Sequence, residues 1–234
     1  MTDLVKSKSS EIWGAIQSSQ KILMCCHPSP DPDSICSNLA LYHALTALGK
    51  QVSVIAGDTE IPKTISHLPG VAKIIPKNWT QINPSDFDLF LSLDASSLEQ
   101  ITKLAKIIFP PTLKTIVIDH HASNQNFGYI NLLDTTYIST GEIVFDLFSE
   151  WQLPLTKDIA ANLYLAIYTD SGGFKYPKTS IQTYQTAIKL IEIFPDFSNL
   201  VFLYENQNDP ETITSKVWLS VPSNCFLIIR SPSQ

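Results

Sequence analysis

The chain has 234 residues, 44% of them hydrophobic, which is enough to bury the core of one large domain or two small ones. Its formal net charge of −6 argues against a broad basic surface for long duplex nucleic acid, so any polyanionic substrate must be neutralised locally. The only arginine is Arg230, so the body of the chain has no bidentate phosphate clamp.

The first half of the chain alternates between helical and strand-like segments. In chain order we predict helix 3–19, strand 21–26, helix 33–48, strand 51–56, strand 87–93, a helix from Ser96 or Ser97 to Ile108, and strand 114–118. Gly49 ends the second helix, and Pro110 and Pro111 stop the third. This alternation predicts an α/β fold in which helices flank a parallel sheet.

After residue 138 the pattern is mainly helical. Ser139 and Glu142 are spaced as a capping box for a helix that runs to about Trp151. Two further helices are predicted, one from about residue 156 to Asp170 and one over 180–194, with a weaker helix through Leu203.

Cysteine usage and hydropathy bear on the cellular compartment. The four cysteines show no C-x-x-C spacing, which favours reduced thiols in a cytoplasmic protein. The amino-terminal 20 residues lack the apolar core of a signal peptide, and no apolar run reaches the roughly 18 residues of a membrane helix. We therefore expect a cytoplasmic protein with no membrane partner.

Acidic and histidine clusters follow three of the predicted strands. His27, Asp31 and Asp33 come after the first, Asp94 after the third, and the triplet 119–121 (Asp-His-His) after the fourth. The carboxyl ends of parallel strands meet at one edge of a sheet, where ligands bind. Hard oxygen ligands with a few imidazoles at that edge suggest divalent metals.

Each cluster also has an ordinary interpretation when taken alone. The proline-rich loop could be a turn in which Asp33 or Ser34 caps the next helix, and Asp94 could be a strand-end residue near a helix cap. Adjacent histidines are often solvated, and Asp170 before Ser-Gly-Gly is typical of a helix end. The recurrence of four such clusters in one chain favours a metal site over these alternatives.

In this order the clusters resemble the motifs of the DHH phosphoesterase family. HPSPDPDS is similar to the first motif, LSLDASS to the second, IDHHASN to the third and YTDSGGFKY to the fourth, over roughly residues 20–205. Within the family, the likeness is nearest to the phosphatases of short oligonucleotides and 3′-phosphoadenosine-5′-phosphate, the nanoRNase-like group.

The resemblance implies a metal centre with two divalent cations. One cation would be held by His27, Asp31 and Asp94. The residues implied for the second are Asp33, Asp94, His120 and Asp170. Asp94 would bridge the pair, which can activate water for hydrolysis of a phosphoester. Manganese suits these ligands best, with magnesium and cobalt as the alternatives, and affinity alone does not exclude zinc.

The resemblance also implies roles around the metals. The catalytic residues would be His121, which contacts the phosphate, Asp94, and Asp119, which orients a nearby imidazole. Asn124 and Lys175 would contact substrate, although the family often has arginine where Lys175 stands. Cys36 occupies a position that is usually glycine in the family, and we expect it to be a small buried residue rather than a metal ligand.

The expected organisation is a DHH catalytic domain over 1–205 and a linker-like, truncated tail over 206–234. That tail lacks the Gly-Gly-Gly-His motif of the family's second domain. The implied function is a two-metal phosphoesterase acting on short oligonucleotides or nucleoside 3′,5′-bisphosphates. The alternatives are a manganese-dependent inorganic pyrophosphatase or polyphosphatase, and a truncated, non-hydrolytic domain that binds metal and nucleotide. The expected partners are a short oligonucleotide or nucleotide, and a homodimer is compatible with the sequence.

Overall fold

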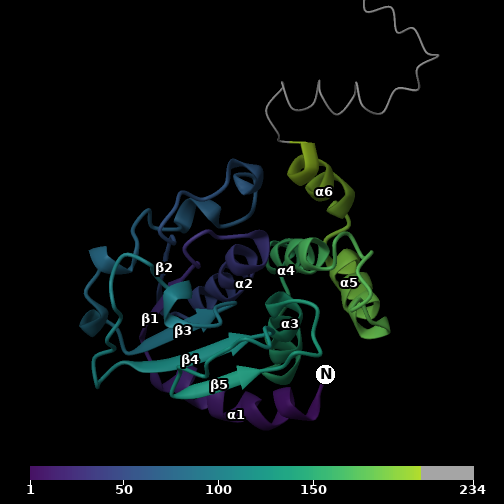
Figure 1. The fold of residues 1–234 in the computed structure, drawn as a ribbon. Coiled ribbons are helices and arrows are strands. Elements are labelled where there is room, and N and C mark those ends of the chain that lie inside the picture. The colour runs from purple at the N-terminus through teal and green to yellow at the C-terminus, as the bar shows by residue number, and fades with distance from the viewer. Residues whose placement is uncertain (207–234) are drawn as a thin grey trace, which may run out of the picture.

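A five-stranded parallel sheet forms the centre of the computed structural model, which describes residues 1–206 (Figure 1). Its strands are β1 (Lys21–Cys25), β2 (Gln51–Ile55), β3 (Leu89–Leu93), β4 (Lys114–Asp119) and β5 (Ile130–Leu133). They lie in the order β2-β1-β3-β4-β5. The predicted α/β fold with a parallel sheet is confirmed.

The central strands β1, β3 and β4 are buried on both faces, which explains why they are apolar runs without regular polar alternation. Within β1, Ile22 and Met24 join the large core on one face, whereas Leu23 and Cys25 join a smaller core on the other. In β3, Leu91 and Phe90 divide in the same way. Successive side chains of a strand point to opposite faces, so a strand buried on both sides is apolar at most positions, with Ser92 and Thr115 as buried polar exceptions.

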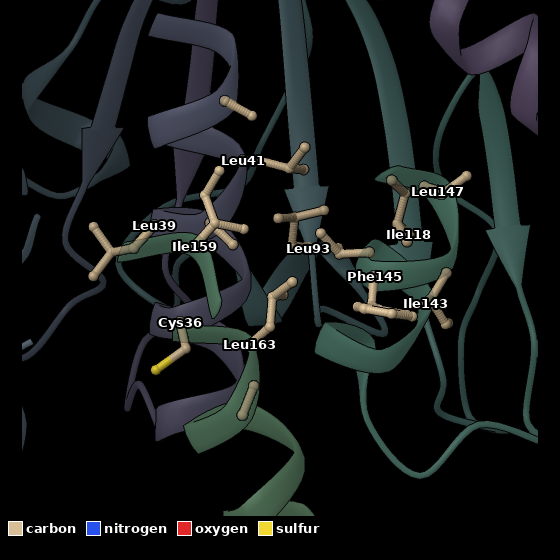
Figure 2. Close-up of a cluster of buried hydrophobic side chains, with 14 of the residues drawn as sticks. Cys36, Leu39, Leu41, Leu93, Ile118, Ile143, Phe145, Leu147, Ile159 and Leu163 are labelled. Atoms are coloured by element: carbon tan, nitrogen blue, oxygen red, sulfur yellow. The ribbon is translucent and has the colours of Figure 1, made fainter. Parts of the chain in front are cut away.

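Helices cover one face of the sheet. Of these, α1 (Asp3–Ser18), α2 (Pro32–Ala47) and α3 (Thr140–Glu150) contact the strands, and α4 (Lys157–Asp170), α5 (Ile181–Ile193) and α6 (Phe197–Asn206) pack mainly against other helices. Figure 2 shows side chains of α2, α3 and α4 gathered around Leu93 and Ile118 at the ends of β3 and β4. Cys36 is fully buried in this cluster, in keeping with a packing role. Residues 139–206 are mainly helical, as predicted.

Short 3-10 turns and loops cover the other face. Trp79 packs edge-on against Phe90 and Phe109, with ring centroids 4.9 and 5.7 Å apart. Apolar residues from the loop after β3 complete this smaller core. The two cores hold the sheet from both sides and fix the positions of its strand ends.

The helix predicted from Ser96 or Ser97 to Ile108 is wrong. Only a single 3-10 turn, η5 (Leu98–Gln100), forms in this segment. The segment that follows this turn is held by Asp58. Its carboxylate accepts hydrogen bonds from the Thr102 hydroxyl and the Lys103 amide, both at 2.7 Å. These long-range bonds give the backbone a partner outside a helix, so tertiary contacts override the local helical pattern.

The sequence pattern also missed the edge strand β5. Its sequence, INLL, is only four residues long, so the segment is too short to be recognised from apolar periodicity. At the carboxyl side, Asn206 is the last residue of α6, and the rest of the predicted tail, 207–234, lies outside the described residues. Within residues 1–206, none of the helices has the length and apolar character needed to span a membrane.

Candidate metal centre

The predicted metal ligands meet at the carboxyl edge of the sheet. The chain passes from β1 to β2 on one side and then crosses to β3 on the other, so the strand order reverses between β1 and β3. Ligands of parallel α/β sheets bind outside the strand ends at such a switch point. His27 and Asp31 follow β1 and Asp94 follows β3, which places them on both sides of this point.

The first ligand group is formed by His27, Asp31 and Asp94, whose donor atoms all lie within 4.8 Å of one another. Asp31 is the N-cap of α2, with its carboxylate accepting a hydrogen bond from the Ser34 amide at 3.0 Å. The His27 Nε2 atom lies 3.4 Å from the Asp31 carboxylate. The start of α2 therefore fixes the loop that carries this group.

Asp94 stands at the centre of the site. Its backbone is in the left-handed region, with φ 56°, a conformation that aspartate and asparagine tolerate better than most residues. The Thr140 hydroxyl donates a hydrogen bond to the Asp94 carboxylate at 3.1 Å. This geometry turns the carboxylate toward His120 Nε2 and His121 Nδ1, each 3.6 Å from Asp94 Oδ1.

The second group is formed by Asp33, His120 and Asp170. The His120 Nε2 atom lies 3.3 Å from the Asp170 carboxylate and 3.8 Å from that of Asp33. Asp33 is held by the first amides of α3, because the N–H groups of Thr140 and Gly141 donate to its two oxygens at 2.7 and 2.9 Å. The amino end of a helix is a favourable place for a carboxylate.

Burial disfavours the ionised form of the carboxyl groups in the site. Desolvation, followed by repulsion from Asp170, raises the pKa of Asp33 well above its ordinary value. Desolvation and then Asp33 likewise raise the pKa of Asp94. The amides of α3 lower the pKa of Asp33 but do not offset these effects. A positive charge between these carboxylates would relieve the repulsion.

The residues fit divalent cations. Both ring nitrogens of His120 are buried without a hydrogen-bond partner, and so is Nδ1 of His27. Buried polar atoms are rarely left unsatisfied unless a water or an ion completes them. Carboxylate oxygens with two imidazoles are also the donor set expected for such ions.

His121 differs from His120 in exposure and partners. Its side chain is 48% exposed, and its Nδ1 atom lies 2.8 Å from the Asp119 carboxylate. The hydrogen bond to Asp119 raises the pKa of His121 and so favours the charged imidazolium. Because the Nδ1 atom also lies near Asp94, the geometry by itself allows a third ligand group of Asp94, His120 and His121.

Asp119 is anchored by several donors. It accepts from the His120 amide at 2.8 Å and from the Asn124 side chain at 2.7 Å. Burial opposes its ionisation, but the hydrogen bonds from His121 and Asn124 lower the pKa of Asp119. The Asn124 side chain also donates to Ala95 and accepts from the Asn126 amide. It therefore joins the loops after β3 and β4.

A cleft of about 280 Å³ opens beside the first ligand group. His27, Asp31, Asp94 and His121 line it, together with Ser96, Gln100 and Ser123. The last three were not predicted as site residues, because isolated serine and glutamine residues carry no recognisable motif. Lys175 lies outside the cleft and the ligand groups, on the exposed turn that follows Asp170.

Gly57 packs closely against the backbone of His27, a member of the first ligand group. A Cβ atom added there would lie 1.9 Å from the His27 carbonyl oxygen, a backbone atom that cannot rotate away. We expect Gly57→Ala to lower the free energy of unfolding by about 2–3 kcal/mol and to weaken metal binding. The matched control is Gly14→Ala in α1, where a Cβ meets nothing within 4 Å.

Urea unfolding of the metal-free protein checks this prediction. Because alanine is the better helix former, Gly14→Ala should raise the free energy of unfolding by about 0.5–1 kcal/mol. Equal stabilities of the two variants would contradict the close packing of Gly57 on His27.

Carboxylates and imidazoles gathered at the switch point of a parallel sheet define a class, the α/β domains that bind divalent metals at their strand ends. The chain belongs to the DHH family, since residues 21–167 match its N-terminal domain. A bifunctional oligoribonuclease and PAP phosphatase NrnA from Thermus thermophilus is 28% identical over 174 residues, covering 73% of this chain and 49% of the relative.

Two other proteins are informative. A probable manganese-dependent inorganic pyrophosphatase from Streptococcus equi subsp. zooepidemicus is 26% identical over 184 residues, covering 74% of this chain and 55% of the relative. An exopolyphosphatase-related protein from Bacteroides fragilis has a similar fold, with a TM-score of 0.82, 24% identity, and coverage of 93% of this chain and 66% of that chain. The chain thus spans about half the length of the two curated relatives.

Proposed function

We propose that the chain is a metal-dependent phosphoesterase that hydrolyses short oligonucleotides or nucleoside 3′,5′-bisphosphates. The observation that carries this proposal is the position of Asp94, which belongs to the first ligand group and also lies 3.6 Å from His120 of the second. The similarity to an oligoribonuclease and PAP phosphatase supports the substrate class. A carboxylate shared between two cation sites beside an open cleft suits phosphoester hydrolysis.

We propose two divalent cations, manganese in the first instance, with magnesium and cobalt as alternatives. His27, Asp31 and Asp94 would hold one ion, and Asp33, Asp94, His120 and Asp170 the other. When bound, the ions supply charge for the phosphate oxygens and lower the pKa of water. Similarity to a probable manganese-dependent pyrophosphatase supports the choice of manganese.

The protein's own residues would position the phosphate. With Nδ1 bonded to Asp119, the imidazolium of His121 keeps Nε2–H free to donate to a phosphate oxygen in the cleft that it lines. Asp119 would act by orienting His121, and Asn124 by holding Asp119 and the backbone of Ala95. In this proposal Asn124 assists substrate binding through Asp119. Lys175 is a proposed contact for a more distant phosphate, because it is exposed.

Further proposals concern the binding partners, the cellular location, the oligomeric state and the domain boundary. The expected partner is a short oligonucleotide or nucleotide, and the net charge of −6 does not favour a long duplex. The described cysteines, Cys25, Cys26 and Cys36, are free and buried, which supports a cytoplasmic location. A homodimer stays a prediction, as does a catalytic domain that ends near residue 205.

A hydrolysis screen with manganese tests the function. We expect cleavage of a ribodinucleotide and of a nucleoside 3′,5′-bisphosphate, with pyrophosphate at least about tenfold slower, and loss of all activity with a chelator. Faster hydrolysis of pyrophosphate would establish the alternative that the Streptococcus relative suggests. Metal binding without hydrolysis of any substrate would overturn the phosphoesterase and favour a non-hydrolytic binding domain.

A further inference from the structure

The side chains that line the cleft at the metal centre are of two chemical kinds, which we call its first and second wall. One is formed by His27, Asp31, Asp94 and His121, and all four belong to the candidate metal groups or contact them. The other is formed by Ser96, Gln100 and Ser123, which are neutral. No lysine or arginine within residues 1–206 lines this cleft. Divalent cations held by the first wall would match a phosphate, and the second wall has no charge to offer one.

The side chains of the second wall have unused hydrogen-bonding capacity. Within residues 1–206, none of these three side chains makes a hydrogen bond to another residue. Ser96 and Gln100 are half-buried, and Ser123 is exposed. Serine hydroxyls and a glutamine amide each donate and accept, which is the combination that a sugar hydroxyl requires. A ribose 2′-hydroxyl likewise donates and accepts.

Contacts between loops hold this wall in place. The Ser96 carbonyl accepts from the Gln125 amide at 2.8 Å, which ties the Ser96 loop to the loop that carries Ser123. Gln100 ends the η5 turn, and the chain just after it is fixed by the bonds from Thr102 and Lys103 to Asp58. A wall fixed before the substrate arrives loses little conformational entropy on binding.

We propose that Ser96, Gln100 and Ser123 bind the 2′-hydroxyl of the ribose next to the scissile phosphate, and so favour ribonucleotides over deoxyribonucleotides. This inference rests on the proposed phosphoesterase function. The phosphate lies against the first wall, and the adjoining sugar extends across the cleft to the second. Gln100 contributes most, because its half-buried amide has a donor and an acceptor on separate atoms, whereas a serine hydroxyl uses one oxygen for both.

The test compares Gln100→Leu with the wild-type chain on three esters with manganese. These are a ribodinucleotide, its deoxyribose counterpart, and bis(p-nitrophenyl) phosphate, which has no sugar. Losing one hydrogen bond should lower kcat/KM for the ribodinucleotide by about three- to tenfold, and the other two should change by less than about twofold. Ser96→Ala is a second variant with the same expected direction.

Gln125→Leu is the matched control, since Gln125 is exposed and its side chain does not line the cleft. It should leave all three esters unchanged. An equal loss on all three esters in Gln100→Leu, or no loss, would overturn the inference while leaving the proposed function standing. A loss confined to a nucleoside bisphosphate would also overturn it, since the wall would then bind a second phosphate. Absence of hydrolysis by the wild-type chain would overturn the proposed function, and the inference with it.

Discussion

Asp94→Asn is expected to lower kcat with manganese by about a thousandfold or more and to remove most metal binding. The reason is that Asp94 belongs to the first ligand group and faces His120 of the second, so one substitution removes a negative ligand from both. A neutral amide oxygen is a much weaker ligand for a divalent cation than a carboxylate. Calorimetric titration with manganese should show two ions on the wild-type chain and at most one, weakly bound, on the variant.

The same substitution should leave the metal-free fold intact. Asparagine accepts the left-handed backbone of Asp94, and its side-chain oxygen can keep the hydrogen bond from Thr140. Replacing the carboxylate also relieves the repulsion that, together with burial, raises the pKa of Asp94. The Tm of the metal-free variant should therefore equal or exceed that of the wild-type chain.

Manganese should raise the Tm of the wild-type chain, because a ligand that binds only the folded state stabilises it, and should raise that of Asp94→Asn much less. Differential scanning calorimetry with and without manganese measures both effects. Unchanged stoichiometry in the variant, or zero stoichiometry in the wild-type chain, would refute a shared carboxylate between two ions.

His120→Ala and His121→Ala are expected to separate metal binding from substrate binding. His120 is 8% exposed and neither of its ring nitrogens has a hydrogen-bond partner, whereas His121 is half-exposed and bonded to Asp119. His120→Ala should weaken manganese binding by about a hundredfold or more. His121→Ala should weaken it by less than about fivefold, and both should lose about a hundredfold or more in kcat.

Asp119 keeps the structures of the two variants comparable, because it has hydrogen-bond partners other than His121. In His121→Ala it keeps hydrogen bonds from the His120 amide and the Asn124 side chain, so the loop after β4 should stay in place. Circular dichroism of the metal-free variants checks this point. Equal loss of bound manganese in the two variants would contradict the division of roles and would place His121 among the metal ligands, as the third ligand group allows.

The sequence by itself determined the strands β1 to β4 and the candidate ligand residues that follow them. A strand buried on both faces is apolar at most positions, so β1, β3 and β4 are recognised in the sequence as apolar runs. Polar residues that directly follow such runs must lie at the carboxyl edge. The His27 and Asp31 loop, Asp94 and the 119–121 triplet could therefore be assigned to one site from local pattern.

Only the tertiary structure decided how these residues are held. Asp33 accepts hydrogen bonds from the amides of Thr140 and Gly141, more than a hundred residues away in the chain. The helix predicted after Ser96 is absent because Asp58 captures Thr102 and Lys103, and this exposes Gln100 to the cleft. The edge strand β5 forms through its pairing with β4. Such bonds join segments that are distant in sequence, and their free energy outweighs the weak local preferences that sequence patterns report.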